Sequence, residues 1–399
     1  MLKATKIRLY PTREQRDALR FQFGAVRWVY NDTLALRQRA WQQHRQSITE
    51  RMTLDRLVEL KKQAQTAWLK DADSQALQQA VMHLDDAFQR FFQKKARYPK
   101  FKTKYGKQSL SYPQRVKLVD QKLYLPKVGW VKAHCHRTLK GRIKTVTVSL
   151  TPTGKYFASI LGDDGLGAPK PPQVVEDTSI VGIDLGLNNL TVDCTGQAHA
   201  NPRFANQAAR NLRRKQKALS RKKKGSANRN KARLKVAKAH ERMANARHDY
   251  QHKLSKHLVD KNHAICVETL RVKNMLKNRR LARSISDAAW GELVRKLEYK
   301  CKWYGKHLVR MDPFYPSSKT CSHCGSKLKT LELDVRGWTC IVCGTRHDRD
   351  INAAINIKAQ GILQLKVAGL SVSACGSSRK ARVGQPSLAA AREAGSLSL

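Results

Sequence analysis

The chain has 399 residues, with 78 Lys and Arg against 30 Asp and Glu, and therefore a formal net charge of +48 at pH 7. A surplus of this size repels itself unless a polyanion neutralises it, so nucleic acid is the expected partner and a small-metabolite enzyme is disfavoured. Hydrophobic residues make up 41% of the chain, which is enough for folded cores and argues against wholesale disorder.

The first 170 residues predict a small β-domain that is interrupted by helices. Residues 3–10 alternate polar and apolar side chains and read as a strand, and residues 12–92 change to helical periodicity, with Ser74 as the expected N-cap of the last helix. Short alternating runs return over residues 108–162 and predict further strands. A linker rich in Gly and Pro follows at 162–173.

The second half of the chain predicts an α/β core with a mixed sheet. Helices and strands alternate along it, as they do in layered α/β folds. The expected strands are 179–186, 190–196, 263–270 and 306–312, and the expected helices are 207–260, broken near Gly225, and 284–305. From about residue 361 the chain is rich in Ala, Ser and Gly, and we expect a disordered tail in which Cys375 is incidental.

Four of the nine cysteines have the spacing of a metal site. They form two C-x-x-C pairs separated by fifteen residues, each pair followed by a glycine. This spacing is typical of a zinc ribbon, in which four thiolates close the coordination shell and the ion is structural rather than catalytic. We expect His323 and His347 to be bystanders. The predicted zinc ligands are Cys321, Cys324, Cys340 and Cys343.

Three carboxylates stand out because apolar or small residues surround them. Asp184 interrupts the apolar run VGIDLG, Glu268 ends ICVETL, and Asp350 begins a helix with small residues in its first turns. Each has a simple structural explanation by itself, since Asp348 or Asp350 could cap that helix. Brought together, however, they would supply the hard oxygen ligands of two Mg²⁺ ions for phosphodiester hydrolysis. GIDLG could also be the phosphate loop of an actin-like ATPase.

Two basic stretches are candidate nucleic-acid surfaces. The run over 210–242 is helical and nearly single-signed, so its self-repulsion favours phosphate as a partner. A second patch covers 276–284. From these stretches we predict contacts by Arg213, Arg214, Arg221, Lys222, Lys223, Lys224, Arg279 and Arg280.

Long motifs in the chain resemble one known family. They include IRLYPTREQ near the start, GIDLGLNN around the first carboxylate, and later VETLRVKNMLKNRRLARSISDAAWGEL, YPSSKTCSHCG and CGTRHDRDINAAINI. Over residues 1–360 the chain is similar to TnpB (OrfB) proteins, which are RNA-guided nucleases of bacterial insertion sequences, related to type V CRISPR effectors.

The resemblance implies an α+β multidomain fold and assigns domains to it. We expect an RNase H-like (RuvC) α/β core with an inserted zinc ribbon, and a wedge β-barrel-like domain carrying a helical recognition lobe. The expected boundaries are 1–10 and 100–170 for the wedge, 11–99 for the recognition lobe, 175–315 and 345–360 for the core, 316–344 for the ribbon, and 361–399 for the tail.

The resemblance also implies an activity. A guide RNA from the transposon end would direct cleavage of matching double-stranded DNA beside a short adjacent motif, with Asp184, Glu268 and Asp350 as the catalytic triad, two Mg²⁺ and one structural Zn²⁺. Glutamine can read adenine in the major groove, so the motif-reading candidates are Ser74, Gln75, Gln78 and Gln114.

The first residues are charged and contain no apolar signal, and no stretch is apolar enough to span a membrane. We therefore expect a cytoplasmic, nucleoid-associated protein that acts as a monomer with its RNA. The alternatives are a DNA transposase, a non-catalytic RNA-guided regulator, and a simple zinc-ribbon binder of nucleic acid.

Overall fold

The computed structural model describes residues 1–332 and 334–373. They form two compact units: residues 1–168 with 209–244 make the first, and residues 169–208 with those from 245 onward make the second. Among the described helices, none is both long enough and apolar enough to cross a membrane.

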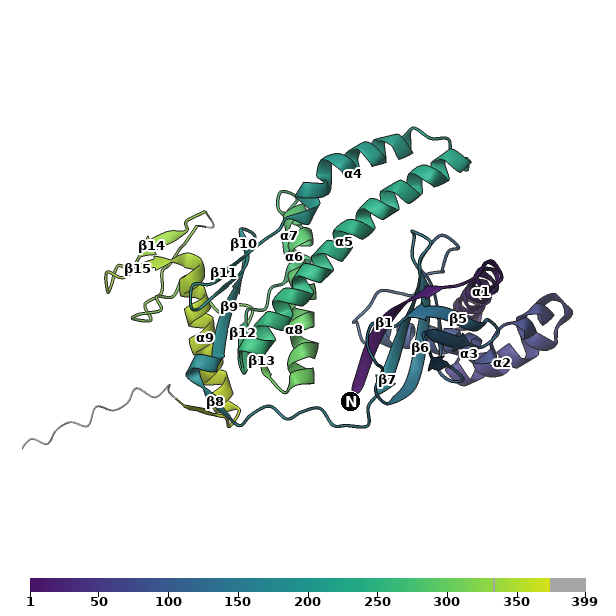
Figure 1. The fold of residues 1–399 in the computed structure, drawn as a ribbon, viewed down its shortest axis with the longest axis horizontal. Coiled ribbons are helices and arrows are strands. Elements are labelled where there is room, and N and C mark those ends of the chain that lie inside the picture. Colours follow the sequence, from purple (N-terminus) through teal and green to yellow (C-terminus); the bar gives the residue numbers. More distant parts are fainter. Residues whose placement is uncertain (333, 374–399) are drawn as a thin grey trace, which may run out of the picture. The chain divides into compact units, whose positions relative to one another are not determined.

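The first unit contains a seven-stranded antiparallel sheet (Figure 1) in the order β2-β6-β7-β1-β5-β4-β3. The strand at the start of the chain lies inside this sheet, between β7 and β5, and so joins the later strands into one domain. The strands are β1 (Leu2–Tyr10), β2 (Gln108–Tyr112), β3 (Lys117–Val119), β4 (Lys122–Leu125), β5 (Gly129–His134), β6 (Arg142–Leu150) and β7 (Tyr156–Asp163).

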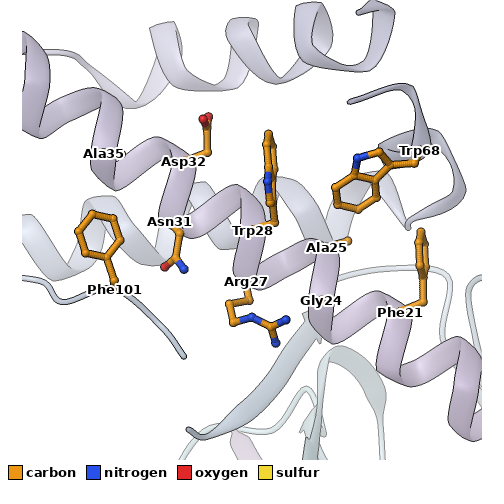
Figure 2. Close-up of a pocket in the computed structure, with 10 residues that line it drawn as sticks. All are labelled: Phe21, Gly24, Ala25, Arg27, Trp28, Asn31, Asp32, Ala35, Trp68 and Phe101. Carbon is orange, nitrogen blue, oxygen red and sulfur yellow. The ribbon is translucent and has the colours of Figure 1, made fainter. Parts of the chain in front are cut away.

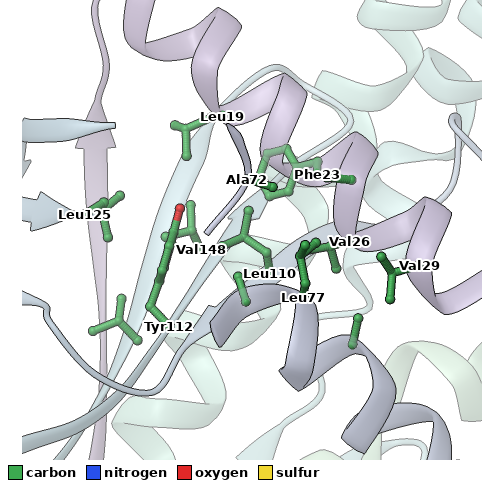
Figure 3. Packing of buried hydrophobic residues seen from close by; sticks show 14 of the residues in the cluster. Leu19, Phe23, Val26, Val29, Ala72, Leu77, Leu110, Tyr112, Leu125 and Val148 are labelled. Atoms are coloured by element: carbon green, nitrogen blue, oxygen red, sulfur yellow. The ribbon is translucent and has the colours of Figure 1, made fainter. Parts of the chain in front are cut away.

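Helices fill the insertion between β1 and β2. They are α1 (Arg13–His44), α2 (Glu50–Lys62), the 3-10 helix η1 (Ala64–Asp71) and α3 (Ser74–Phe92). Asp73, not Ser74, caps α3, because its carboxylate accepts the backbone N–H of Ala76 at 2.9 Å. The helices share one apolar core with the sheet (Figure 3), where Phe23 and Val26 of α1 meet Leu110 and Val148.

The second unit is built on a five-stranded mixed sheet in the order β11-β10-β9-β12-β13. β10 runs antiparallel to β9, whereas β9, β12 and β13 are parallel to one another. This is the mixed α/β sheet that the pattern predicts. The strands are β9 (Ile180–Leu185), β10 (Asn189–Asp193), β11 (Ala198–Ala200), β12 (Ala264–Val267) and β13 (His307–Arg310).

Helices cover both faces of this sheet. Ile183 of β9 packs on one face with α5 and α8, whereas Ile180 packs on the other face with α9. The predicted helix 284–305 is divided by Ala289, which has a left-handed backbone conformation (φ 50°). The helices in this half of the chain, of which residues 209–244 of α4 and α5 belong to the first unit, are α4 (Phe204–Ser220), α5 (Ala227–Lys261), α6 (Val272–Met275), α7 (Ala282–Ala288), α8 (Trp290–Tyr304) and α9 (Arg349–Val367).

The expected start of a disordered tail at residue 361 is wrong. α9 continues to Val367, and β16 (Ser371–Ser373) pairs in parallel with β8 (Val174–Glu176). The composition is misleading here because Leu365 lies at helical spacing from Ile357 and is buried with it against the sheet. Cys375 and the rest of the expected tail, 374–399, lie outside the described residues.

Candidate metal centres

The two strand carboxylates lie on the same face of the second unit's sheet. Side chains alternate between the faces of a strand, so Asp184 shares the α9 face with Gly182, and Glu268 shares it with Cys266. The parallel register pairs Val267 with Ile183. The residues that follow these two, Glu268 and Asp184, therefore lie side by side. The backbone N–H of Leu185 donates to Oε1 of Glu268 at 3.0 Å and fixes this carboxylate against β9.

α9 carries the third carboxylate, and two glycines let this helix lie directly on the sheet. A Cβ atom at Gly182 would be 2.1 Å from the carbonyl oxygen of Ala354, and one at Gly361 would be 2.1 Å from Sγ of Cys266. Contacts this short do not occur, so only glycine allows the observed approach. The approach brings the first turn of α9 within electrostatic range of Asp184 and Glu268.

Asp350 is free of a capping role. Asp348 is the N-cap of α9 and accepts the backbone N–H groups of Asp350 and Ile351, each at 3.0 Å. The carboxylate of Asp350 instead accepts a hydrogen bond of 3.4 Å from Arg336. Of the two capping alternatives, the structure therefore selects Asp348.

Burial and neighbouring charges raise the pKa of two of the carboxylates, Asp184 and Glu268. Burial, followed by the charges of Glu268 and Asp350, raises the pKa of Asp184 well above its usual value. Burial also raises the pKa of Glu268 to about 7, and the charge of Asp350 acts in the same direction, whereas the hydrogen bond from Leu185 opposes it. These shifts favour the protonated forms of Asp184 and Glu268, and a bound cation would favour their charged forms.

The three carboxylates offer oxygen ligands, which suit divalent cations that prefer oxygen. Mg²⁺ is commonly held by one or two carboxylates together with substrate phosphate oxygens. Within the described part of the chain, the four-cysteine cluster is the one group of three or more potential ligands close enough to share a single ion. Asp184, Glu268 and Asp350 are not such a group, so as placed here the three carboxylates do not converge on a single ion.

The four predicted zinc ligands converge in the second unit. The sulfur atoms of Cys321, Cys324, Cys340 and Cys343 all lie within 4.8 Å of one another, and the pairs Cys321–Cys343 and Cys324–Cys340 are both 3.6 Å apart. A tetrahedral zinc with Zn–S bonds of about 2.3 Å requires sulfurs about 3.8 Å apart, so the site fits Zn²⁺.

Both C-x-x-C pairs sit on the same type of turn. Gly325 (φ 77°) and Gly344 (φ 68°) each donate a backbone N–H, to the carbonyls of Cys321 and Cys340, at 2.9 Å. A positive φ suits glycine best, which explains the glycine behind each pair. His347 is not in the group of converging ligands, but its Nε2 lies 3.0 Å from Sγ of Cys321, within reach of a hydrogen bond that would orient this ligand.

The cysteine cluster is attached to the helix that carries Asp350. The short strands β14 (Gly337–Thr339) and β15 (Arg346–Asp348) pair beside it, and β15 continues directly into α9. On α9, the amide of Asn352 donates to the carbonyl of Thr320 at 2.8 Å and accepts from the N–H of Ser322 at 2.9 Å. The cysteine-bearing turns therefore support the first turns of α9.

Comparison with known proteins identifies the family. Residues 166–279 match a family model described as "Probable transposase", 290–357 match "Cas12f1-like, TNB domain", and 1–46 match "Helix-turn-helix domain". A Streptomyces pristinaespiralis protein named "Putative RNA-guided DNA endonuclease" is 42% identical over 379 residues, covering 94% of this chain and 91% of its own. The chain belongs to the TnpB (OrfB) family.

Another relative and one solved structure are also similar to this TnpB chain. The Escherichia coli (strain K12) protein "Putative RNA-guided DNA endonuclease InsQ" is 35% identical over 393 residues, 94% of each chain. The chain in "Cryo-EM structure of the Cas12f1-sgRNA-target DNA complex" is 16% identical, with 90% of this chain and 99% of that chain covered and a TM-score of 0.36. Residues 1–46, the helix-turn-helix match, fold in this TnpB protein as β1 and one long helix, α1.

The expected motif-reading residues lie in the first unit, three of them on α3. Nε2 of Gln75 donates to Oε1 of Gln114 at 3.1 Å, so these two amides form a pair at the surface. Gln78 is exposed one turn further along α3, and the hydroxyl of Ser74 accepts a hydrogen bond of 3.0 Å from Lys61. The structure thus brings residues from α3 and the segment after β2 together.

The basic candidates are exposed but belong to different units. The distal parts of α4 and α5, residues 209–244, are counted with the first unit, and α4 has no buried residue. Arg279 and Arg280 lie in the second unit, on the turn between α6 and α7. The exposed residues on the distal parts are Arg213, Arg214, Arg221, Lys222, Lys223 and Lys224.

Sequence reasoning missed the groups that support the carboxylates. Arg336 contacts Asp350, and the charge of Arg349 lowers the pKa of Asp184 against the larger effects of burial and the other carboxylates. Gly182 was visible inside an apolar strand pattern, where an isolated glycine signals close backbone approach, but this signal does not say which element approaches.

Proposed function

We propose that the protein is an RNA-guided DNA endonuclease that hydrolyses phosphodiester bonds at Asp184, Glu268 and Asp350. It would act as a monomer bound to a guide RNA from its transposon end, on double-stranded chromosomal DNA that matches the guide. The observation that carries the proposal is the proximity of these carboxylates: the parallel register and the hydrogen bond from Leu185 hold Glu268 against β9, which carries Asp184, and the charge of Asp350 on α9 acts on both. The names of the relatives support the RNA-guided part.

The arrangement of an RNase H-like (RuvC) core explains what each residue would do. Asp184 and Glu268, fixed by the strand register, would hold divalent cations at one position, and Asp350 would hold them from α9. Two bound Mg²⁺ ions would activate the attacking water and stabilise the leaving oxygen. Arg336 neutralises Asp350 in their absence, and it would be free to contact phosphate once a cation takes its place.

The Gln75–Gln114 pair is the proposed reader of the DNA motif beside the target. Asn and Gln recognise adenine bidentately in the major groove, and both amides are accessible at the surface of the first unit. Ser74 and Gln78 flank the pair on α3. The exposed cations of 209–244, with Arg279 and Arg280, would bind the guide and its heteroduplex through phosphates, because guide pairing rather than protein contact reads the remaining sequence.

The test is guided cleavage by purified protein with its copurified RNA. Asp184→Asn, Glu268→Gln and Asp350→Asn each keep the shape of the side chain but remove its charge. Loss of a cation that supplies several kcal/mol lowers the cleavage rate about a thousandfold. Guide-dependent DNA binding, measured by filter binding, should remain within about twofold of the wild type, because phosphate contacts dominate it.

Asp260→Asn is the matched control, since Asp260 is an exposed carboxylate on α5 that pairs with Lys256. It should cleave normally. If all three amide variants lose binding together with cleavage, the carboxylates have a structural role and the proposal fails. DNA strand transfer without RNA would favour the transposase instead.

A further inference from the structure

A groove runs along one face of α1 in the first unit and has no role in the proposed function. It encloses about 600 Å³, within the range of about 300–1,000 Å³ that is typical of ligand sites. Figure 2 shows aromatic side chains in a row along the helix, with Phe101 at one end, Trp28 in the middle, and Trp68 and Phe21 at the other end. We call this feature the α1 groove.

Two rings of the α1 groove, Phe21 and Phe101, are exposed, and the other two, Trp28 and Trp68, are partly buried. Trp68 meets Phe21 edge to face at a centroid distance of 5.9 Å, and meets Trp28 in the same way at 5.7 Å. Phe101 is 50% exposed and Phe21 is 38% exposed. Planar rings with one free face can hold planar ligands, and aliphatic side chains would give no such geometry.

Small residues form the floor of the α1 groove. Gly24, Ala25 and Ala35 line it on α1, at positions where longer side chains would fill it. A Cβ atom at Gly24 would find no atom nearer than Nη2 of Arg27 at 3.9 Å. Helix packing therefore does not require a glycine at position 24, and glycine weakens a helix interior. What this glycine preserves is the open space of the groove.

The loop that carries Phe101 is held in place by α1. The side chain of Asn31 donates to the carbonyl of Lys102 at 2.9 Å and accepts the N–H of Lys102 at 2.8 Å. The ammonium of Lys102 also lies 3.7 Å above the ring of Tyr30. These contacts fix Phe101 between the α1 groove and a second hollow of about 440 Å³, which Phe101 and Arg27 also line.

The charge beside the α1 groove is strongly positive. The segment 90–107, which we call the basic segment, contains eight cations and no Asp or Glu: Arg90, Lys94, Lys95, Arg97, Lys100, Lys102, Lys104 and Lys107. Two acidic groups close by are already paired with cations: Asp32, which lines the groove, pairs with Arg56, and Asp85 on α3 pairs with Arg37.

We propose that the α1 groove binds unpaired nucleobases of a single strand, whose phosphates follow the basic segment. Aromatic faces combined with a positive track are how proteins hold single strands without reading their sequence, since every base has a face that can stack. The proposal rests on the proposed function only for the origin of that strand, which is either an unpaired part of the guide RNA or the displaced DNA strand.

Photo-cross-linking of the full-length protein tests this proposal. Short RNA strands with 4-thiouridine and DNA strands of the same sequence with 4-thiothymidine are irradiated with the protein, and the labelled peptides are mapped by mass spectrometry. We expect labels at Trp28 and Phe101. Stronger labelling by RNA identifies the guide as the source, and stronger labelling by DNA identifies the displaced strand.

Gly24→Leu is the decisive variant because a Cβ at this position meets no close contact, the longer side chain takes up space in the α1 groove, and leucine favours the helix, so the melting temperature should not fall. It and Phe101→Ala should reduce labelling in the groove by about fivefold or more, and leave the labelling of residues 209–244 unchanged. Trp41→Ala removes an exposed ring of α1 outside the groove and should label like the wild type.

Wild-type labelling of the groove in Gly24→Leu, or no labelling there in the unmodified protein, would overturn the assignment. The outcome is independent of DNA cleavage. A protein that labels in the groove but does not cut guided DNA contradicts only the proposed function, and a guided nuclease with no labelling there contradicts only the groove.

Discussion

The carboxylate face of the second unit and the basic distal helices of the first unit are built in opposite ways. Asp184 lies on β9 and Glu268 directly follows the adjacent parallel strand β12, and the charge of Asp350 acts on both from a helix that approaches the sheet through two glycines. The distal parts of α4 and α5, residues 209–244, instead present many cations, nearly all of them exposed.

This difference predicts how each region responds to mutation. A site that depends on the relative position of three groups is sensitive to displacements of about 1 Å, which can lower a reaction rate about a hundredfold. A surface that depends on summed charge loses its affinity gradually as cations are removed. Small changes in packing should therefore damage the first region and leave the second nearly unaffected.

The largest effect should come from adding one methyl group at Gly182. Gly182→Ala places Cβ 2.1 Å from the carbonyl oxygen of Ala354 and 2.5 Å from the N–H nitrogen of Lys358, so α9 must move and take Asp350 with it. We expect about a hundredfold loss in the rate of guided cleavage, and a cost of about 1–3 kcal/mol in the free energy of unfolding.

Gly291→Ala on α8 is the control for this substitution, because a Cβ there has no atom within 4 Å. It should cleave at the wild-type rate and be slightly more stable in denaturant unfolding. Normal cleavage by Gly182→Ala would mean that the close approach of α9 does not position Asp350.

Removal of zinc should have the next largest effect. Cys340→Ser breaks the cysteine cluster, which supports the first turns of α9 through Asn352. We expect about one equivalent of zinc to be lost, measured by elemental analysis, and cleavage to fall about 10–100-fold, the usual cost of disturbing the support of a metal ligand. Cys135→Ser, in the first unit, should change neither quantity. A zinc-free variant with full activity would contradict the link between the cluster and Asp350.

Mg²⁺ dependence should change with pH. Glu268, with a pKa raised to about 7, is mostly protonated at pH 6 and mostly charged at pH 8, and only the charged form binds the cation. The Mg²⁺ concentration for half-maximal cleavage should therefore rise about tenfold between pH 8 and pH 6.

Lowering the pH from 8 to 6 should weaken Mg²⁺ binding but stabilise the metal-free protein. Because folding raises this pKa, the stabilisation from the bound proton is fully present below about 4.5 and lost as the pH rises through about 7. The rise in melting temperature that Mg²⁺ causes should accordingly be larger at pH 8 than at pH 6, and Glu268→Gln should reduce that difference. An equal Mg²⁺ effect at both pH values would contradict a shared cation site.

Some features of the carboxylate site can be predicted from the sequence, and others cannot. Asp184 and Glu268 are detectable because a carboxylate inside an apolar strand is costly, and the cysteines are detectable from their spacing. The approach of α9 is not predictable, because Gly182 and Gly361 are far apart in the chain and neither shows what it contacts. The cap of α3 was misplaced by one residue because Asp and Ser cap equally well.

The α1 groove was also hidden in the sequence. Trp28 and Phe21 are spaced like core residues of an amphipathic helix, and the pattern does not reveal that this face of α1 is left partly open. The basic helices, in contrast, are predictable from the sequence, because a run of charges of one sign indicates exposure. The structure adds only which unit they belong to.

The smallest effect should come from the basic surface. It tests whether this region acts through summed charge rather than exact geometry. Changing Lys222, Lys223 and Lys224 to Ala removes three exposed cations between α4 and α5. If all three contact phosphate, the slope of log affinity against log salt should decrease by about 2–3 units, with about 0.9 per contact on duplex DNA and about 0.7 on a single strand.

At saturating guide and target, the same triple variant should cleave at the wild-type rate, because the carboxylates are untouched. Lys253→Ala is the control, since this lysine is already paired with Asp249 on α5 and should not alter the slope. A triple variant with an unchanged salt slope would show that these cations do not contact the nucleic acid. A triple variant that binds normally but cleaves slowly would mean that the charged surface also positions the substrate. Binding and cleavage would then not be divided between the two regions.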